Sequence, residues 1–244
     1  MLIAFLADIH ANKQAFEACL AHAQAQNVDR FVFLGDYVGY GGDPAWTVET
    51  IMNMVAKGAV AVQGNHDVTI GQAVNHLNGE AQLVVEWTRG ELGVEERRFL
   101  AELPLTIRDE DRLYVHADAS APERWNYVTS IEDAARSMMA TRQRLTFVGH
   151  VHLPTIYGLS ATAKMTSFTP VSGVPVPLLN WRRWHIVTGS VGQPRDRDSA
   201  ASYSIYDTNK GEITFCRVAY DIEAAAATIR KNGLPVWLAE RLFM

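Results

Sequence analysis

Three short apolar runs near the N-terminus alternate with two helical patterns, and this alternation limits the fold more than any other feature. The apolar runs cover residues 2–6, 31–34 and 59–62. Continuous apolar runs of this length are typical of strands that are buried on both faces of a sheet. Between the runs, apolar residues recur at helical spacing after Asn12, and a second helix is indicated over residues 44–56. This order of elements predicts a parallel sheet covered by helices.

Each of these predicted strands ends at residues that can bind a metal ion or transfer a proton. The three strand ends carry Asp8-Ile9-His10, Gly35-Asp36 and Gly64-Asn65-His66-Asp67. Two later apolar runs, residues 113–115 and 145–148, end in His116 and in Gly149-His150-Val151-His152. Ligand sites of such sheets lie at the carboxyl ends of the strands, so we expect these polar groups to lie close together.

The chemical composition of this group favours a metal centre. The candidate ligands are Asp8, His10, Asp36, Asn65, His116, His150 and His152. Carboxylate, imidazole and amide groups without thiolate suit Mn, Fe, Zn, Ni or Mg ions. The Asp-x-His and His-x-His spacings place alternate side chains on one side of an extended backbone. Seven ligands exceed the needs of one ion, so we expect two ions about 3.5–4 Å apart, bridged by a carboxylate.

The remaining chain divides into a helical and a strand-rich part. We expect a helical insertion at about residues 68–104 within a single domain of residues 1–244. Residues 155–219 alternate short β-like runs with Pro- and Gly-rich turns, which favours a second, mostly antiparallel sheet. Strands are predicted at 155–159, 185–188, 202–206 and 213–218, and two helices follow, over 222–230 and from Pro235.

Composition excludes several classes of protein. The net charge of −5 over 244 residues does not favour a basic nucleic-acid-binding protein. Cys19 and Cys216 are too few for a disulfide framework or a cysteine-rich metal site. No apolar run approaches the roughly 20 residues of a membrane helix, and residues 1–7 are too short for a signal peptide. We therefore expect a cytoplasmic protein.

The motifs at the strand ends, taken in this order, resemble those of the calcineurin-like metallophosphoesterase superfamily. They extend from Asp8 to His152. The segment from Gly189 to Asp196 also resembles the small prokaryotic phosphodiesterase branch. The resemblance implies a four-layer α/β/β/α sandwich of two mixed sheets flanked by helices, with a dinuclear metal site at the strand ends.

The resemblance also implies a role for each residue. Asp8, His10 and His152 would hold the first ion, Asn65, His116 and His150 the second, and Asp36 would bridge them. His66 would be the general acid that protonates the leaving oxygen. A water between the two ions would be acidified and act as the nucleophile. This implies a metal-dependent phosphoesterase.

The loop after Asp36 departs from the phosphoprotein-phosphatase pattern. Gly39 and Tyr40 stand where that branch has an Asp that orients the histidine and an Arg that binds phosphate. Residues 186–188 likewise replace an Asn-Pro that often precedes the Gly-Ser of the phosphodiesterases. Without an Arg in this loop, a diester monoanion is matched better than a monoester dianion. We expect a phosphodiester substrate, with Tyr37, Ser190 and Arg195 as substrate-binding candidates.

Alternative functions remain open at this point. The same site could serve a phosphomonoesterase, or a nucleotide or protein phosphatase, and a non-catalytic metal-binding scaffold is a further alternative. A nuclease is also considered, because Arg195, Arg197 and the segment Trp181-Arg182-Arg183-Trp184 could contact a nucleic-acid strand. The acidic net charge argues against nucleic acid. A small phosphate ester is therefore the expected partner, and no membrane contact is expected.

Overall fold

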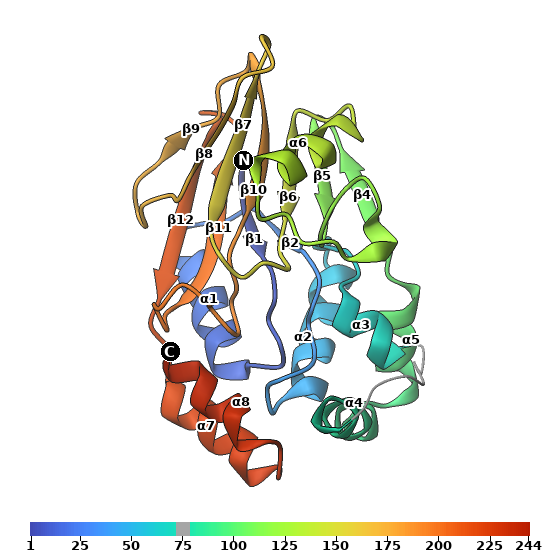
Figure 1. Cartoon of the computed structure of the whole chain (residues 1–244). Helices are drawn as coiled ribbons and strands as arrows, with labels where there is room; N and C mark the ends of the chain where they lie inside the picture. The colour runs from blue at the N-terminus through green and yellow to red at the C-terminus, as the bar shows by residue number, and fades with distance from the viewer. Residues whose placement is uncertain (72–78) are drawn as a thin grey trace.

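Two six-stranded mixed sheets lie between helices in the computed structural model, which describes residues 1–71 and 79–244 (Figure 1). The first sheet has the strand order β3-β2-β1-β11-β12-β9. Its strands are β1 (Leu2–Leu6), β2 (Arg30–Phe33), β3 (Val60–Ala61), β9 (Val176–Pro177), β11 (Ala201–Asp207) and β12 (Glu212–Val218). β1, β2 and β3 are parallel, as the sequence predicts, and β11 pairs with β1 in the antiparallel direction.

The second sheet has the strand order β4-β5-β6-β10-β7-β8. Its strands are β4 (Thr106–Asp109), β5 (Arg112–Val115), β6 (Leu145–Val148), β7 (Thr155–Ser160), β8 (Met165–Phe168) and β10 (Arg182–Val187). β5, β6 and β10 are parallel, whereas β4, β7 and β8 pair in the antiparallel direction.

The prediction that residues 155–219 form a separate, mostly antiparallel sheet is wrong. The four predicted strands exist as β7, β10, β11 and β12, but they are divided between the two sheets. β11 pairs with the free edge of β1, and β10 pairs with the free edge of β6. Each of these N-terminal strands would otherwise expose unpaired backbone groups along one edge.

The continuous apolar run of β1 follows from burial on both faces. Ile3 and Phe5 point into the core between the sheets, while Ala4 and Leu6 belong to the core on the opposite face. Phe5 stacks on Phe147 of β6, with ring centroids 3.8 Å apart and an angle of 4° between the rings.

Helices cover the outer faces of both sheets. They are α1 (Lys13–Ala25), α2 (Pro44–Ala56), α3 (Asn65–Gly71), α4 (Glu80–Glu91), α5 (Val94–Glu102), α6 (Ile131–Met139), α7 (Ile222–Lys231) and α8 (Val236–Glu240), with 3₁₀ turns at Pro122–Arg124 and Arg241–Phe243. Phe16 of α1 and Ile51 of α2 pack on the first sheet. Met138 of α6 packs on the second sheet. The layers therefore run helix, sheet, sheet, helix, which confirms the predicted four-layer sandwich.

The predicted helical insertion contains α4, α5 and part of α3. Residues 72–78, which fall within it, lie outside the described residues. Val84 of α4 packs against α7 and α8, which lie together at the C-terminal end of the chain (Figure 1). The division of the chain into one domain with an insertion stays a prediction. Within residues 1–71 and 79–244, none of the helices has the length and apolar composition of a membrane span.

Candidate metal centre

The loops at the carboxyl ends of β1, β2, β5 and β6 bring the predicted ligands together. Five of these residues have a left-handed backbone, with φ of 53° at Asp8, 50° at His10, 55° at Asp36, 66° at His150 and 63° at His152. This conformation is unfavourable for residues other than glycine and is concentrated at functional sites. The chain therefore turns sharply after each strand, which aims the side chains at one region.

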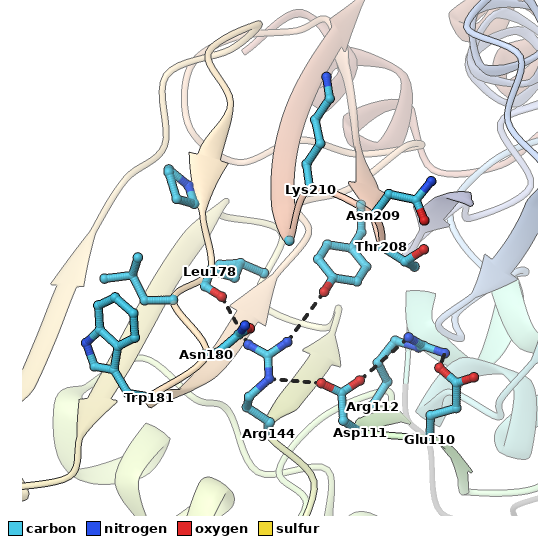
Figure 2. A pocket seen from close by; sticks show the side chains of 14 residues that line it. Glu110, Asp111, Arg112, Arg144, Leu178, Asn180, Trp181, Thr208, Asn209 and Lys210 are labelled. Atoms are coloured by element: carbon cyan, nitrogen blue, oxygen red, sulfur yellow. Dashed lines mark hydrogen bonds and ion pairs between the residues drawn. The ribbon is translucent and has the colours of Figure 1, made fainter.

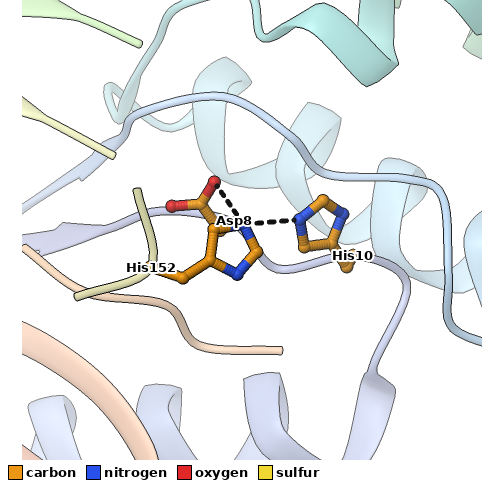
Figure 3. Close-up of side chains that lie close together, drawn as sticks. All are labelled: Asp8, His10 and His152. Atoms are coloured by element: carbon orange, nitrogen blue, oxygen red, sulfur yellow. Dashed lines mark hydrogen bonds and ion pairs between the residues drawn. The ribbon is translucent and has the colours of Figure 1, made fainter. Parts of the chain in front are cut away.

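Asp8, His10 and His152 form the first group of ligand atoms, and these lie within 4.8 Å of one another (Figure 3). The Nε2 atom of His152 is 3.3 Å from Asp8 Oδ1 and 3.3 Å from His10 Nε2. Both oxygens of Asp8 accept the backbone N–H of His150 at 3.0 Å, which ties the loop after β1 to the loop after β6.

Backbone carbonyl groups fix the tautomers of these two histidines. His10 Nδ1 donates to the carbonyl of Val38 at 3.1 Å, and His152 Nδ1 donates to the carbonyl of Gln193 at 2.7 Å. Because a carbonyl oxygen can only accept, each neutral ring has its lone pair on Nε2. Two lone pairs then face each other across 3.3 Å, beside a carboxylate. Such an arrangement suits a cation that both nitrogens bind.

Asp36, His116 and His150 form the second group, to which Asn65 adds an amide oxygen. His116 Nε2 lies 3.3 Å from Asp36 Oδ2, 3.1 Å from His150 Nδ1 and 3.2 Å from Asn65 Oδ1.

Carbonyl groups fix the tautomers of the second group as well. His116 Nδ1 donates to Leu34 O at 2.7 Å, and His150 Nε2 donates to Trp125 O at 2.9 Å. In their neutral forms, His116 Nε2 and His150 Nδ1 therefore both direct a lone pair into the group. The two histidine pairs thus repeat one arrangement, in which a carbonyl orients each ring for a cation.

Asp36 lies between the two groups. Its Oδ2 atom is 3.3 Å from His116 Nε2 and 3.9 Å from His10 Nε2. Burial alone would raise the pKa of Asp36, but His116, His66 and His10 hold it well below its usual value. Burial alone would lower the pKa of His116, but Asp36 outweighs it and raises that pKa to about 9. The carboxylate thus favours positive charge beside it, and these oxygen and imidazole donors fit divalent ions of hard to borderline character.

His66 lies beside both groups at the start of α3. Its backbone N–H donates to Asp36 Oδ1 at 2.9 Å, and its ring centroid is 5.0 Å from that of His10. Burial lowers the pKa of His66. The ring is also close enough to His10 and Asp36 to count as a ligand by distance alone. Gly39, with φ of +84°, gives the ring its space, because a Cβ there would lie 2.5 Å from His66 Nδ1.

Asp67 supports the centre, although the motif analysis assigns it no role. It is fully buried and accepts the backbone N–H groups of Asp36, Tyr37 and Gly64 at 2.8, 2.9 and 2.9 Å. Burial, assisted by the charge of Asp36, raises the pKa of Asp67 to about 7. This carboxylate joins the loop after β2 to the loop after β3. The sequence signal that could have identified Asp67 is its position in the Gly64–Asp67 motif.

The three substrate-binding candidates differ in their surroundings. Tyr37 is fully buried, and its hydroxyl donates to Phe33 O at 3.0 Å. Ser190 is also fully buried, and its hydroxyl donates to Asp8 O at 2.9 Å. These buried hydrogen bonds indicate that Tyr37 and Ser190 support the loops around the centre. Arg195 is close enough to the hydroxyl of Tyr40 to lower its pKa, although burial of Tyr40 has the larger, opposite effect.

A cavity of about 500 Å³ lies at the opposite end of the strands (Figure 2). Its two arginines are already paired: Arg112 contacts Glu110 at 2.6 Å and Asp111 at 3.6 Å, and Arg144 contacts Asp111 at 2.9 Å. The cavity contains none of the predicted site residues. The predicted site residues therefore lie at the strand ends and not in this cavity.

Comparisons with known proteins agree with this geometry. Residues 1–211 match the sequence profile of the calcineurin-like phosphoesterase superfamily domain. An uncharacterised protein of Methanocaldococcus jannaschii is 33% identical over 251 residues, covering 100% of this chain and 98% of the relative. The crystal structure of a metallophosphoesterase from Sphaerobacter thermophilus superposes with a TM-score of 0.88 at 34% identity, covering 99% of this chain and 98% of that one.

A hypothetical protein from Pyrococcus horikoshii shares the fold. It has a TM-score of 0.79 at 19% identity over 99% of this chain and 97% of that one. The family profile, the relatives and the clustered ligand groups identify a phosphoesterase for which the family implies divalent metal ions. The chain belongs to the calcineurin-like phosphoesterase superfamily.

Proposed function

We propose that the protein hydrolyses a small phosphate ester, with a phosphodiester favoured, at a centre that holds two divalent ions. The observation that carries this proposal is the position of Asp36. Its Oδ2 atom lies 3.3 Å from a histidine of one ligand group and 3.9 Å from a histidine of the other. A shared carboxylate between two sets of ligands is the arrangement expected of two-metal hydrolytic sites.

Each predicted site residue would have a distinct role. Asp8, His10 and His152 would hold one ion, Asn65, His116 and His150 the other, and Asp36 would bridge them. When bound, the ions would supply charge stabilisation for the phosphoryl group and an acidic water for attack. His66 contacts His10 and Asp36 from outside these two sets and would protonate the leaving ester oxygen.

The preference for a diester follows from the charges beside the centre. The loop from Tyr37 to Gly42 contains no cation, and Arg195 approaches this loop at Tyr40. Arg195 also donates to Gln193 Oε1 at 3.2 Å, so part of its guanidinium is already bonded. We infer that Arg195 contacts one phosphoryl oxygen. A single, partly engaged arginine suits a monoanionic diester better than a dianionic monoester.

Two alternative functions receive less support. A nuclease would use the arginines near Trp181, but Arg183 Nη2 donates to the carbonyl groups of Thr141 and Gln143 at 2.7 and 3.0 Å. A non-catalytic scaffold that only bound metal ions would not require an additional histidine, His66, beside a complete set of ligands.

A phosphate-ester panel tests the proposed function. The metal-stripped protein is reconstituted with Mn, Mg, Ni or Zn in turn and assayed on bis(4-nitrophenyl) phosphate and on 4-nitrophenyl phosphate. We expect metal-dependent hydrolysis with the higher kcat/KM for the diester. A preference for the monoester of tenfold or more would contradict the diester assignment. Tight metal binding without turnover of any ester in a broad panel would support the scaffold instead.

A further inference from the structure

An exposed aromatic ring lies directly on one of the proposed metal ligands. The ring of Tyr127 stacks on the ring of His150, with centroids 4.1 Å apart and an angle of 16° between the planes. One face of Tyr127 is covered by His150, yet 53% of the residue remains exposed. More than half of Tyr127 is therefore accessible while its ring lies against a proposed ligand.

The segment that carries Tyr127 is held over the centre by the ligands themselves. Trp125 adopts a left-handed backbone with φ of 54°, and its carbonyl accepts His150 Nε2 at 2.9 Å. Its ring meets that of His116 edge-on, with centroids 5.9 Å apart. Two contacts with two different proposed ligands therefore hold Trp125, two residues before Tyr127, beside the centre.

Tyr40 borders the centre from the first sheet. Its ring centroid lies 4.5 Å from that of His10 and 4.7 Å from that of His66. Tyr40 has a left-handed backbone with φ of 65°. Trp237 of α8 supports its ring at a centroid distance of 6.4 Å.

We propose that Tyr127 is a specificity-determining residue that binds a planar aromatic ester group of the substrate by stacking. The proposal rests on the proposed function, because it names the class of ester that this centre accepts. Aromatic rings stack favourably on flat partners and tolerate differences between them. The substrate class is therefore a phosphate ester of a nucleoside or of another planar aromatic alcohol, rather than of a sugar or an alkyl chain.

Equilibrium binding tests this proposal without requiring turnover. The Zn²⁺-loaded protein is titrated with adenosine monophosphate and with ribose 5-phosphate, which share a phosphorylated ribose and differ in the aromatic base. We expect the wild type to bind the nucleotide at least fivefold more tightly, the lower limit for one stacked base of about 1–3 kcal/mol. Tyr127→Phe should keep this ratio, whereas Tyr127→Leu should reduce it to below about twofold.

Two controls separate stacking from loss of structure. Trp181→Ala removes another exposed aromatic residue, 69% exposed and at the distant cavity, and should leave both affinities unchanged. The zinc content of Tyr127→Leu should equal that of the wild type, because Tyr127 is not a ligand. A Tyr127→Leu variant that loses zinc would show that the residue supports His150 instead, and would overturn the proposal.

The outcomes distinguish this proposal from the proposed function. Equal affinity of the wild type for the two phosphates would overturn the aromatic specificity, even if diesters are hydrolysed. A retained preference for the nucleotide, lost in Tyr127→Leu, would support the aromatic subsite even if the ester panel shows no turnover.

Discussion

At the scale of single residues, the centre depends on which ring nitrogen of each histidine carries the proton. Val38, Gln193 and Leu34 each accept that proton through a backbone carbonyl, so the other nitrogen is free to bind a cation. His66 is placed differently from the proposed ligands: its own backbone N–H donates to Asp36, and Gly39 leaves space for its ring.

The role of His66 leads to a prediction about rate rather than binding. We expect His66→Ala to keep both metal ions yet to lose on the order of 10²–10⁴-fold in kcat, the usual contribution of general acid catalysis. The loss should be smaller for nitrophenyl esters than for alkyl esters, because a good leaving group needs no proton. Kinetics on both ester types, with metal analysis, test this, and His22→Ala on α1 serves as the control. Equal losses for the two ester types would argue against the acid role.

The residue types of the centre could be predicted from the sequence, but several supporting residues could not. Asp8, Asp36 and the histidines stand directly after apolar runs, so local pattern was enough to place them at one edge. Local sequence pattern could not identify Tyr127 and Gly39, because their importance depends on contacts with His150 and His66, which come from other segments of the chain.

At the scale of elements, buried strands and capped helices follow from local signals. Asn12 caps α1 by accepting the backbone N–H of Ala15 at 3.1 Å, and Ser130 with Asp133 forms the capping box of α6. Three short strands, β4, β8 and β9, were not predicted. β8 and β9 end in exposed positions, and β4 has a mixed pattern, so none of them carries a continuous apolar run. The partners of β10 and β11 depend on long-range pairing, which local pattern does not contain.

The link between the loops after β2 and β3 makes Asp67 important for stability. Asp67→Asn keeps the shape of the side chain but replaces one acceptor oxygen with an amide N–H₂ group. This donor would face the backbone N–H groups that Asp67 now accepts. We expect a loss of about 2–4 kcal/mol in the free energy of unfolding, because buried N–H donors lose an acceptor and meet another donor instead. Chemical denaturation measures this change.

The matched control for Asp67 is an exposed carboxylate. Glu102→Gln removes an exposed ion pair with Arg98, and we expect a change below about 1 kcal/mol. Equal stability of Asp67→Asn and Glu102→Gln would show that Asp67 does not hold the two loops together.

At the scale of the whole molecule, the second sheet carries a buried titratable group on the face that α6 covers. His185 on β10 is fully buried, and among the described residues neither of its ring nitrogens has a hydrogen-bond partner. Burial lowers the pKa of His185 to about 4. The unfolded chain, with an ordinary histidine pKa near 6.5, therefore binds more protons between these two pH values.

This difference predicts a loss of stability in acid. The contribution of His185 to the free energy of unfolding should be constant above about pH 6.5 and should fall by about 3 kcal/mol on acidification to pH 4. Because other histidines also titrate, the test compares the wild type with His185→Leu in denaturant titrations from pH 4 to pH 8. We expect the stability difference between them to shift by about 3 kcal/mol in favour of the variant at pH 4. A pH-independent difference would contradict the lowered pKa.

The central claim is that Asp36 joins two metal sites, and counting metal ions tests it most directly. The ions per chain are measured by mass spectrometry for the wild type and for Asp36→Asn, each equilibrated with the same buffered concentration of Zn²⁺. We expect two ions in the wild type and a lower occupancy of both sites in the variant, with loss of diester hydrolysis. An Asp36→Asn variant that keeps two ions at wild-type affinity would contradict the claim.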